Sequence, residues 1–306
     1  MRYFLGIDLG GSFMKYGVVD EEGNILSREK RPTQRMDPEA VLADLTQIIL
    51  SVKKEHTLSG VGISLPGVIN SKNQLLSSGA IQDLFQYDVR QIISERTALK
   101  VLLVNDAKAI GYGEKWLGAG KDCQNFVCLP LGTGVGGTIV IDGKVIQGRT
   151  GAAGEFGMML MGLGKTEPVG YESSSVYCGA VAGLCRIYNQ KIGRTSFDTW
   201  EKDIKKIVSL ANDGQKEAQD SLTEFYQNVA VLLLNIRVSI DPELILVGGG
   251  ISENKAIMSG IKQALTKLIL RYSDMSALGA PTIQPCRLGN DAGMIGAVSQ
   301  LIEGEK

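Results

Sequence analysis

The stretch FVCLPLGTGVGGTIVIDGKVIQG, residues 126–148, repeats a pattern that the chain has already used at its beginning. It predicts a strand, a glycine-rich turn, a second strand, an Asp-Gly turn and a third strand. Residues 3–30 show the same succession. In both copies the first turn glycine precedes the next aspartate by ten residues, from Gly10 to Asp20 and from Gly132 to Asp142. This spacing predicts a duplicated fold.

Helices and further strands follow each copy. Asp37 and Pro38 are typical of a helix start, and the apolar residues after them fall on one helical face. GVGISLPG (60–67) and VLLVND (101–106) then predict buried strands, which gives a βββαβαβα unit. After the second copy we expect a helix from about Trp200, and a strand at ELILVGGG (243–250). Between them we expect an amphipathic helix that carries Leu222, Phe225, Val229, Leu232, Leu233 and Ile236.

The composition is that of an ordinary globular protein. The chain has 306 residues, of which 44% are hydrophobic and 21% charged, so two domains with real cores are possible. The expected domains are residues 1–114, with a C-terminal helix at about 292–306 packing back on them, and a larger domain at 115–291. A net charge of −1 favours neither nucleic acid nor an anionic membrane as a partner. Without a signal peptide or an apolar run of 18 residues, a cytoplasmic protein is expected.

Histidine and cysteine are too sparse for several kinds of site. His56 is the only histidine, and the five cysteines contain no C-x-x-C pair. Neither a disulfide framework nor a zinc ribbon is therefore predicted, and a Ser-His-Asp mechanism would have to use that single ring. General-base chemistry consequently falls to a carboxylate.

Three glycine-rich turns are candidate anion sites, at residues 8–15 (DLGGSFMK), 131–137 (LGTGVGG) and 247–252 (VGGGIS). Glycines let backbone N–H groups approach phosphate oxygens closely. Any one of these turns alone could equally be a plain hairpin turn. None of them fits the P-loop or the G-x-G-x-x-G pattern. The first two join strand to strand in the duplicated halves, which favours a nucleotide lying across the cleft between the halves.

The four apolar residues VLLV (101–104) are typical of a buried strand, and Asn105 and Asp106 stand at the start of a probable helix. From position alone, the simpler interpretation is that Asp106 caps the helix, accepting a backbone N–H and offsetting the positive end of the dipole. A carboxylate at a strand end is also suited to take a proton from a bound hydroxyl. The motif context decides between these two interpretations.

Six segments resemble, in order, the motifs of the ROK family (repressors, uncharacterised frames and sugar kinases), and together they cover nearly the whole chain. They are GIDLGGSFMKYGVVD, GISLPGVIN, NDAKA, LGTGVGGTIVIDGKVIQGRTGAAGEFG, LILVGGGIS and GNDAGMIGA. The resemblance implies a duplicated ribonuclease-H-like fold of the actin/hexokinase type, α/β, with ATP and a sugar in the cleft between two domains. It also implies an ATP- and Mg²⁺-dependent sugar kinase.

The resemblance also implies the site residues. Asp106 corresponds to the catalytic base, and Asp8 to a group that holds Mg²⁺ through water or through the ATP phosphates. The implied ATP-binding residues are Asp8, Gly10, Gly11, Ser12, Lys15, Gly132, Thr133, Gly134, Gly136, Gly137, Gly248, Gly249 and Gly250. The implied sugar-binding residues are Gly67, Asn70, Ser78, Gly79, Asn105, Glu155 and Glu172. For Glu155 and Glu172, a solvated loop carboxylate remains the alternative, as a plain type II turn does for the Pro-Gly of LPGVIN.

One departure from the family pattern is large. Most members carry a histidine and a cysteine-rich zinc site after G-E-x-G, whereas this chain has Met158 there and MMLMGLGKTEPVGYES with no cysteine. We therefore expect no zinc, and we expect methionine-rich packing to hold the loop at 158–172. In lacking these zinc ligands, the chain resembles the zinc-less β-glucoside kinases of the family.

The substrate and the assembly are the least determined features. The favoured acceptor is O6 of glucose or of the non-reducing glucose of a β-glucoside such as cellobiose. Glucokinase and N-acetylmannosamine kinase are the alternatives within the enzyme class. A non-catalytic sugar sensor or a transcriptional regulator is the alternative outside it, disfavoured because the first strand begins by residue 3 and leaves no room for a helix-turn-helix. We expect small-molecule partners, sugar and ATP, and a homodimer.

Overall fold

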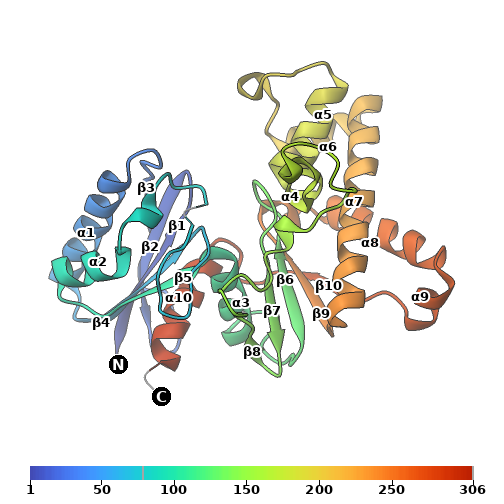
Figure 1. Cartoon of the computed structure of the whole chain (residues 1–306). Helices are drawn as coiled ribbons and strands as arrows, with labels where there is room; N and C mark the ends of the chain where they lie inside the picture. The colour runs from blue at the N-terminus through green and yellow to red at the C-terminus, as the bar shows by residue number, and fades with distance from the viewer. Residues whose placement is uncertain (78, 305–306) are drawn as a thin grey trace. The chain divides into compact units, whose positions relative to one another are not determined.

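The computed structural model describes residues 1–77 and 79–304. This part of the chain forms ten strands and ten α-helices. Figure 1 draws them as arrows and coiled ribbons. Two compact units contain them: unit 1 comprises Met1–Gln124, Thr138–Gly154 and Arg287–Lys306, and unit 2 comprises Asn125–Gly137 and Glu155–Cys286. The domain boundaries expected from the sequence stay a prediction.

Unit 1 contains a five-stranded sheet in the order β3-β2-β1-β4-β5, in which β1 pairs antiparallel with β2 and parallel with β4. Its strands are β1 (Tyr3–Leu9), β2 (Phe13–Asp20), β3 (Glu29–Pro32), β4 (Leu58–Leu65) and β5 (Val101–Asn105), and a hairpin is formed by β7 (Thr138–Ile141) and β8 (Lys144–Val145). Its helices are α1 (Pro38–Glu55), α2 (Val89–Thr97), α3 (Asp106–Trp116) and α10 (Ala292–Glu303).

The alternation of side chains along β1 explains why helices cover both faces of this sheet. Leu5 and Ile7 point into a core that includes the buried face of α1. Phe4 points the other way, into a cluster with Met294 of α10. Gly6 lies on that second face, where a Cβ would come within 2.3 Å of the Met294 side chain. The glycine therefore lets α10 pack directly against the strand.

Unit 2 contains three parallel strands in the order β10-β9-β6. They are β6 (Phe126–Pro130), β9 (Leu244–Gly248) and β10 (Thr282–Pro285). The helices are α4 (Ser174–Cys178), α5 (Arg186–Lys191), α6 (Ile204–Asn212), α7 (Lys216–Ile240), α8 (Lys255–Leu270) and α9 (Ser273–Leu278), and a π-helix spans Ala180–Cys185. The parallel order β6-β9-β10 repeats the parallel order β1-β4-β5 of unit 1, and the β7-β8 hairpin matches the antiparallel pair β2-β3. The duplication predicted from the spacing is therefore confirmed.

Several expected elements are confirmed and two are shifted. Asp37 caps α1 through the Ala40 N–H, as predicted. The third strand expected within residues 3–30 begins only at Glu29, because Ile25 makes no more than an isolated bridge with Val19. The helix expected from about Trp200 begins at Ile204, because the side chain of Asp203 accepts the first free N–H groups.

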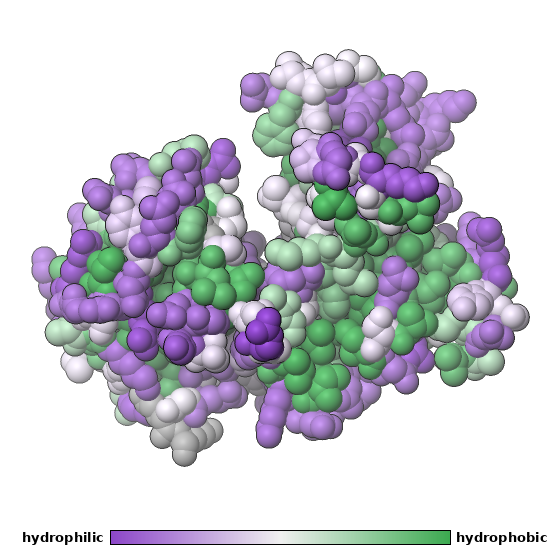
Figure 2. All heavy atoms as spheres, in the orientation of Figure 1, coloured by the Kyte–Doolittle hydropathy of each residue, from purple (hydrophilic) through white to green (hydrophobic). Residues whose placement is uncertain are grey.

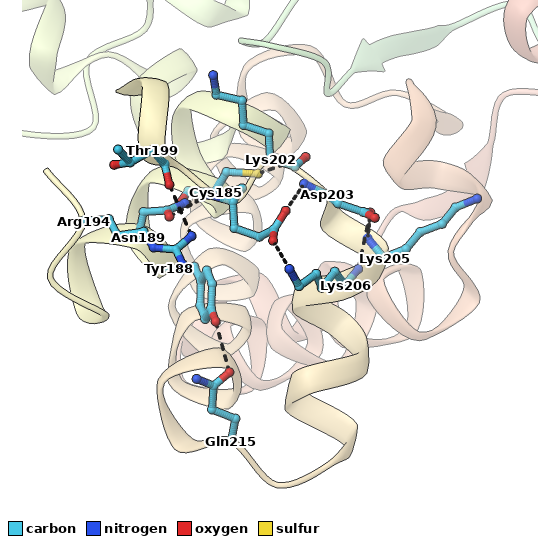
Figure 3. Close-up of polar contacts among 11 residues, drawn as sticks. Cys185, Tyr188, Asn189, Arg194, Thr199, Lys202, Asp203, Lys205, Lys206 and Gln215 are labelled. Carbon is cyan, nitrogen blue, oxygen red and sulfur yellow. Dashed lines mark hydrogen bonds and ion pairs between the residues drawn. The ribbon is translucent and has the colours of Figure 1, made fainter. Parts of the chain in front are cut away.

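A network of hydrogen bonds and an ion pair fixes the segment between α5 and α6, and Figure 3 draws it. The Asn189 side chain accepts the Glu201 N–H (2.8 Å) and donates to the carbonyls of Glu201 (2.9 Å) and Cys185 (2.7 Å). Lys206 pairs with the Glu201 carboxylate at 2.6 Å. Because Asn189 is fully buried, these bonds replace the backbone pairing that an irregular segment lacks.

Polar residues cover most of the face drawn in Figure 2, and hydrophobic ones gather in a few places on it. Within the described residues, no helix combines the length and the apolar character needed to cross a bilayer.

Candidate functional site

The carboxyl end of β5 carries Asn105 and Asp106 into the first turn of α3. Asn105, not Asp106, is the N-cap, because its side chain accepts the Lys108 N–H at 2.9 Å. The interpretation of Asp106 as the cap is therefore wrong. Asp106 Oδ1 instead accepts the Ala107 N–H (2.8 Å) and the Asn105 Nδ2 (3.2 Å). Local donors thus orient this carboxylate at the positive end of the helix dipole.

Asn105 also ties this strand end to the predicted sugar-binding loop of unit 1. Its Nδ2 donates to the Gly67 carbonyl at 2.9 Å. Gly67 has φ +112°, and a Cβ there would lie 1.8 Å from the Ser77 carbonyl oxygen, so only glycine fits. Gly79 packs against Pro66 beside it. Gly67, Gly79 and Asn105 are therefore brought together, whereas Ser78 lies outside the described residues.

Asn70 uses its side chain within its own turn. Its Oδ1 accepts the N–H groups of Lys72 (2.9 Å) and Gln74 (3.0 Å). It also lines, with Asn105 and Lys108, a cavity of about 360 Å³ along β5. Its predicted sugar contact stays a prediction.

The first glycine-rich turn connects β1 to β2 and holds Asp8 at its start. Ser64 donates to Asp8 Oδ1 at 3.0 Å, and the Lys15 ammonium lies 3.9 Å from Oδ2. Burial raises the pKa of Asp8, while Lys15 and the Ser64 hydrogen bond act in the opposite direction. A carboxylate with this desolvation cost is a favourable neighbour for a cation.

A hydrogen bond to Thr33 fixes the Gly10–Gly11 peptide so that the Gly11 N–H points away from Thr33. The Gly10 carbonyl accepts the Thr33 hydroxyl at 2.8 Å. In a trans peptide the carbonyl and the following N–H point in opposite directions, so the Gly11 N–H points away from Thr33. Ser12 follows with an exposed side chain. This geometry suits an anion at Gly11 and Ser12.

In the second glycine-rich turn, in unit 2, two consecutive peptide groups are fixed in the same way, each through its carbonyl. The Gly132 carbonyl accepts the Ala180 N–H (2.8 Å), and the Thr133 carbonyl accepts the Ala182 N–H (3.0 Å). Both donors belong to the first turn of the π-helix. The N–H groups of Thr133 and Gly134 consequently point away from that helix. Within the described part of the chain, neither N–H has a protein acceptor, so both are open to an anion.

The rest of this turn is structural. The Gly136 N–H is bonded to the Pro130 carbonyl at 3.1 Å, and Gly137 is buried before β7. In the third turn, Gly249 has φ +82° and lies against Leu131, whereas a Cβ at Gly250 would meet nothing within 4 Å. The backbone of Gly250 is therefore accessible, whereas Gly248 is buried, and the adenosine contact is predicted at these glycines.

Glu155 lies in unit 2 directly before the short 3₁₀ helix Phe156–Met158. Ser174, at the start of α4, donates its hydroxyl to the Phe156 carbonyl and is fully buried. The next residue, Ser175, accepts the Val135 N–H at 3.1 Å. Two adjacent serines thus join the Glu155 segment to the second glycine-rich turn, a link that the sequence did not reveal.

Lys108 and Thr33 are further residues that the sequence analysis missed. Lys108 is only 2% exposed, and its ammonium donates to the Gly151 carbonyl in the loop before Gly154. A lysine between two alanines in NDAKA was the available signal. Thr33 lies too far from Gly10 in the sequence to be connected with it by pattern.

Gly293 and Asn73 were missed as well. A Cβ on Gly293 would lie 2.6 Å from Asp8 Oδ1, so this glycine of GNDAG gives Asp8 its space. Asn73 forms two hydrogen bonds with the backbone of Leu103, at 2.6 Å and 2.9 Å, and so covers the edge of β5.

Glu172 has its carboxylate inside its own loop, where it accepts the N–H groups of Gly164 and Thr166. Hydrogen bonds from the side chain and the N–H of Thr166, and from the Gly164 N–H, lower the pKa of this carboxyl. Within residues 1–77 and 79–304, no group of three or more His, Cys, Asp or Glu side chains could hold a metal ion. The absence of zinc stays a prediction.

Comparison with solved structures defines the fold class of the protein. A ROK family glucokinase from Streptomyces griseus, solved in complex with glucose and AMPPNP, superimposes with a TM-score of 0.82 over 99% of both chains at 28% identity. The chain therefore has the duplicated, actin/hexokinase-type α/β fold.

The family follows from the sequence comparison. The model of the ROK family matches residues 4–303, so the chain belongs to the ROK family. It is 30% identical to a beta-glucoside kinase of Listeria monocytogenes over 300 residues, which are 97% of both proteins. It is also 30% identical to a glucokinase of Streptomyces coelicolor, over 97% of this chain and 96% of the relative. Its relatives of these two kinds are sugar kinases.

Proposed function

We propose that this protein is an ATP- and Mg²⁺-dependent kinase that phosphorylates O6 of glucose or of the non-reducing glucose of a β-glucoside such as cellobiose. The observation that carries the proposal is the placement of Asp106. Its carboxylate lies at a strand end, is oriented by two donors and stands beside Asn105, which fixes the Gly67 loop. Such a carboxylate can accept the proton of an attacking hydroxyl, as phosphoryl transfer requires.

The glycine-rich turns support the phosphate half of the proposal. The N–H groups of Gly11, Thr133 and Gly134 point away from the contacts that hold their turns, and Gly250 leaves open backbone. Backbone donors fixed in this way stabilise phosphate charge without having to reorganise during the reaction. The proposed division of roles gives Asp106, Asn105 and Gly67 to the acceptor and these turns to ATP.

The residues around Asp8 fit a Mg²⁺ ion. Burial disfavours the charged form of Asp8. The Lys15 ammonium, 3.9 Å from Asp8 Oδ2, offsets part of this cost. Asp8 would hold the ion through water, because Mg²⁺ retains several water ligands. When bound, the ion neutralises charge on the phosphate oxygens.

The acceptor preference rests on the relatives, which include both beta-glucoside kinases and glucokinases. The exposed apolar residues Met158, Leu160 and Leu163 favour an acceptor with an aglycone, because they offer an apolar surface in the segment after Glu155. Glucokinase activity is the second candidate, favoured by the Streptomyces relatives.

The test is an ADP-release assay with glucose, N-acetylmannosamine, cellobiose, gentiobiose and arbutin, with and without Mg²⁺. We expect turnover only with Mg²⁺, and the highest kcat/KM with a β-glucoside. A tenfold preference for glucose over every β-glucoside would establish the glucokinase alternative. A preference for N-acetylmannosamine would reject both, and sugar binding without turnover would indicate a sensor.

A further inference from the structure

The segment between Met158 and Glu172 has no metal ligands of the cysteine or histidine type, yet it is folded back on itself. Leu160 and Ser173 form a bridge, the Met161 N–H donates to the Glu172 carbonyl (2.8 Å), and the Ser174 N–H donates to the Met159 carbonyl (2.7 Å). Apolar burial does not hold its tip, because Leu163 is 83% exposed. The methionine-rich packing expected from the sequence therefore does not explain the order at the tip.

The tip is organised around one carboxylate. Glu172 is only 7% exposed. Its Oε2 accepts the Gly164 N–H at 2.7 Å, and its Oε1 accepts the Thr166 N–H at 2.5 Å. Both oxygens of the anion are thus bonded to backbone donors on the opposite side of the loop. Hydrogen bonds to an ionised acceptor are about twice as strong as neutral ones.

The loop leaves room for this arrangement. A Cβ on Gly162 would lie 2.1 Å from Glu172 Oε2, so the carboxylate occupies the space that any other residue would fill. Gly164 adopts φ +66°, which directs its N–H inward at no steric cost. Two glycines and one acid therefore form a compact anion-centred turn.

This turn is connected to the segment that carries Glu155. The Ser174 N–H that donates to the Met159 carbonyl belongs to the same residue whose hydroxyl donates to the Phe156 carbonyl, next to Glu155. A change in the turn would consequently reach the predicted acceptor contact through a few covalent and hydrogen-bonded steps.

We propose that Glu172 is a positioning residue whose buried carboxylate orders residues 161–173 by gathering backbone N–H groups. In this role it replaces the metal that the family resemblance places in this loop. A metal cation gathers anionic side chains, whereas here an anion gathers N–H donors. The effect on the acceptor rests on the proposed kinase function, but the ordering of the loop does not.

The test begins with hydrogen exchange on the sugar-free protein. Glu172→Gln keeps the size of the side chain but retains only one acceptor oxygen, so we expect the Gly164 and Thr166 amides to exchange at least tenfold faster. Gly162→Ala displaces the carboxylate without removing it and should give the same result. Glu167→Gln, an exposed acid of the same loop, is the matched control and should leave both amides protected.

Steady-state kinetics separate positioning from direct contact. For Glu172→Gln we expect a higher KM for the acceptor, an unchanged KM for ATP and a kcat within about threefold of the original, with partial recovery in Glu172→Asp. If the two amides stay protected while acceptor KM rises, Glu172 binds the sugar directly and the proposal is wrong. It is also wrong if neither changes. Loss of protection in a protein that phosphorylates no sugar would uphold the loop role and reject the kinase function instead.

Discussion

Replacing Gly293 with alanine tests the role of Asp8 through a single methyl group. The new Cβ would lie 2.6 Å from Asp8 Oδ1 and 3.1 Å from Ser64 Oγ, whereas ordinary contacts begin at 3.4 Å. The carboxylate must therefore withdraw by about 0.8 Å. A misplacement of about 1 Å in a reacting geometry costs on the order of 10²-fold in rate. We expect kcat to fall about 30- to 100-fold, which corresponds to roughly 2–3 kcal/mol in the barrier.

The fold should survive this change, because alanine is favoured over glycine in a helix and Gly293 lies in α10. The assay is ADP release as a function of Mg²⁺ concentration, with thermal unfolding as a check of folding. Gly170→Ala is the matched control, because its Cβ would meet nothing within 4 Å. We expect the Gly293 variant to need more Mg²⁺ for half-maximal rate. A kcat within twofold of the original, at an unchanged Mg²⁺ requirement, would refute the placement of Asp8.

Three further predictions concern neighbouring polar groups. Asn105→Asp keeps the helix cap but loses the donor to the Gly67 carbonyl, so acceptor KM should rise and chemical denaturation should show a loss of about 1–3 kcal/mol in the free energy of unfolding. Lys108→Met removes the donor to the buried Gly151 carbonyl, and a similar loss by the same assay is expected; an unchanged unfolding free energy would contradict this contact. Because hydrogen bonds lower the pKa of Glu172, its ionised form stabilises the folded state at neutral pH, and this contribution is lost as pH falls through the native pKa. The stability difference between the original protein and Glu172→Gln should therefore be largest near pH 7 and shrink in acid; a difference independent of pH would oppose that sign.

The sequence predicts well what depends on local pattern. The duplicated spacing predicts the repeated strand order, and Asp37 with Pro38 predicts the start of α1. The buried face of α7 was predicted from its helical periodicity. These features follow from neighbours in the chain, whose relative positions the backbone geometry fixes.

The contacts that the sequence analysis missed join distant parts of the chain. Thr33 bonds to Gly10, and Gly293 makes room for Asp8, but no spacing rule connects such pairs. The interpretation of Asp106 as the helix cap was wrong for another reason. Asparagine and aspartate are both good caps, and only the exact first residue of α3 shows that Asn105 is the cap.

The central claim is that Asp106 takes the proton of the sugar hydroxyl during phosphoryl transfer. The most direct measurement is ADP release by Asp106→Asn, with sugar binding measured on the same preparation. The amide keeps its hydrogen bonding but cannot accept the proton, so we predict that kcat falls by about 10²-fold or more while sugar affinity stays within a few-fold. A variant that retained more than about a tenth of the original kcat would contradict the general-base role.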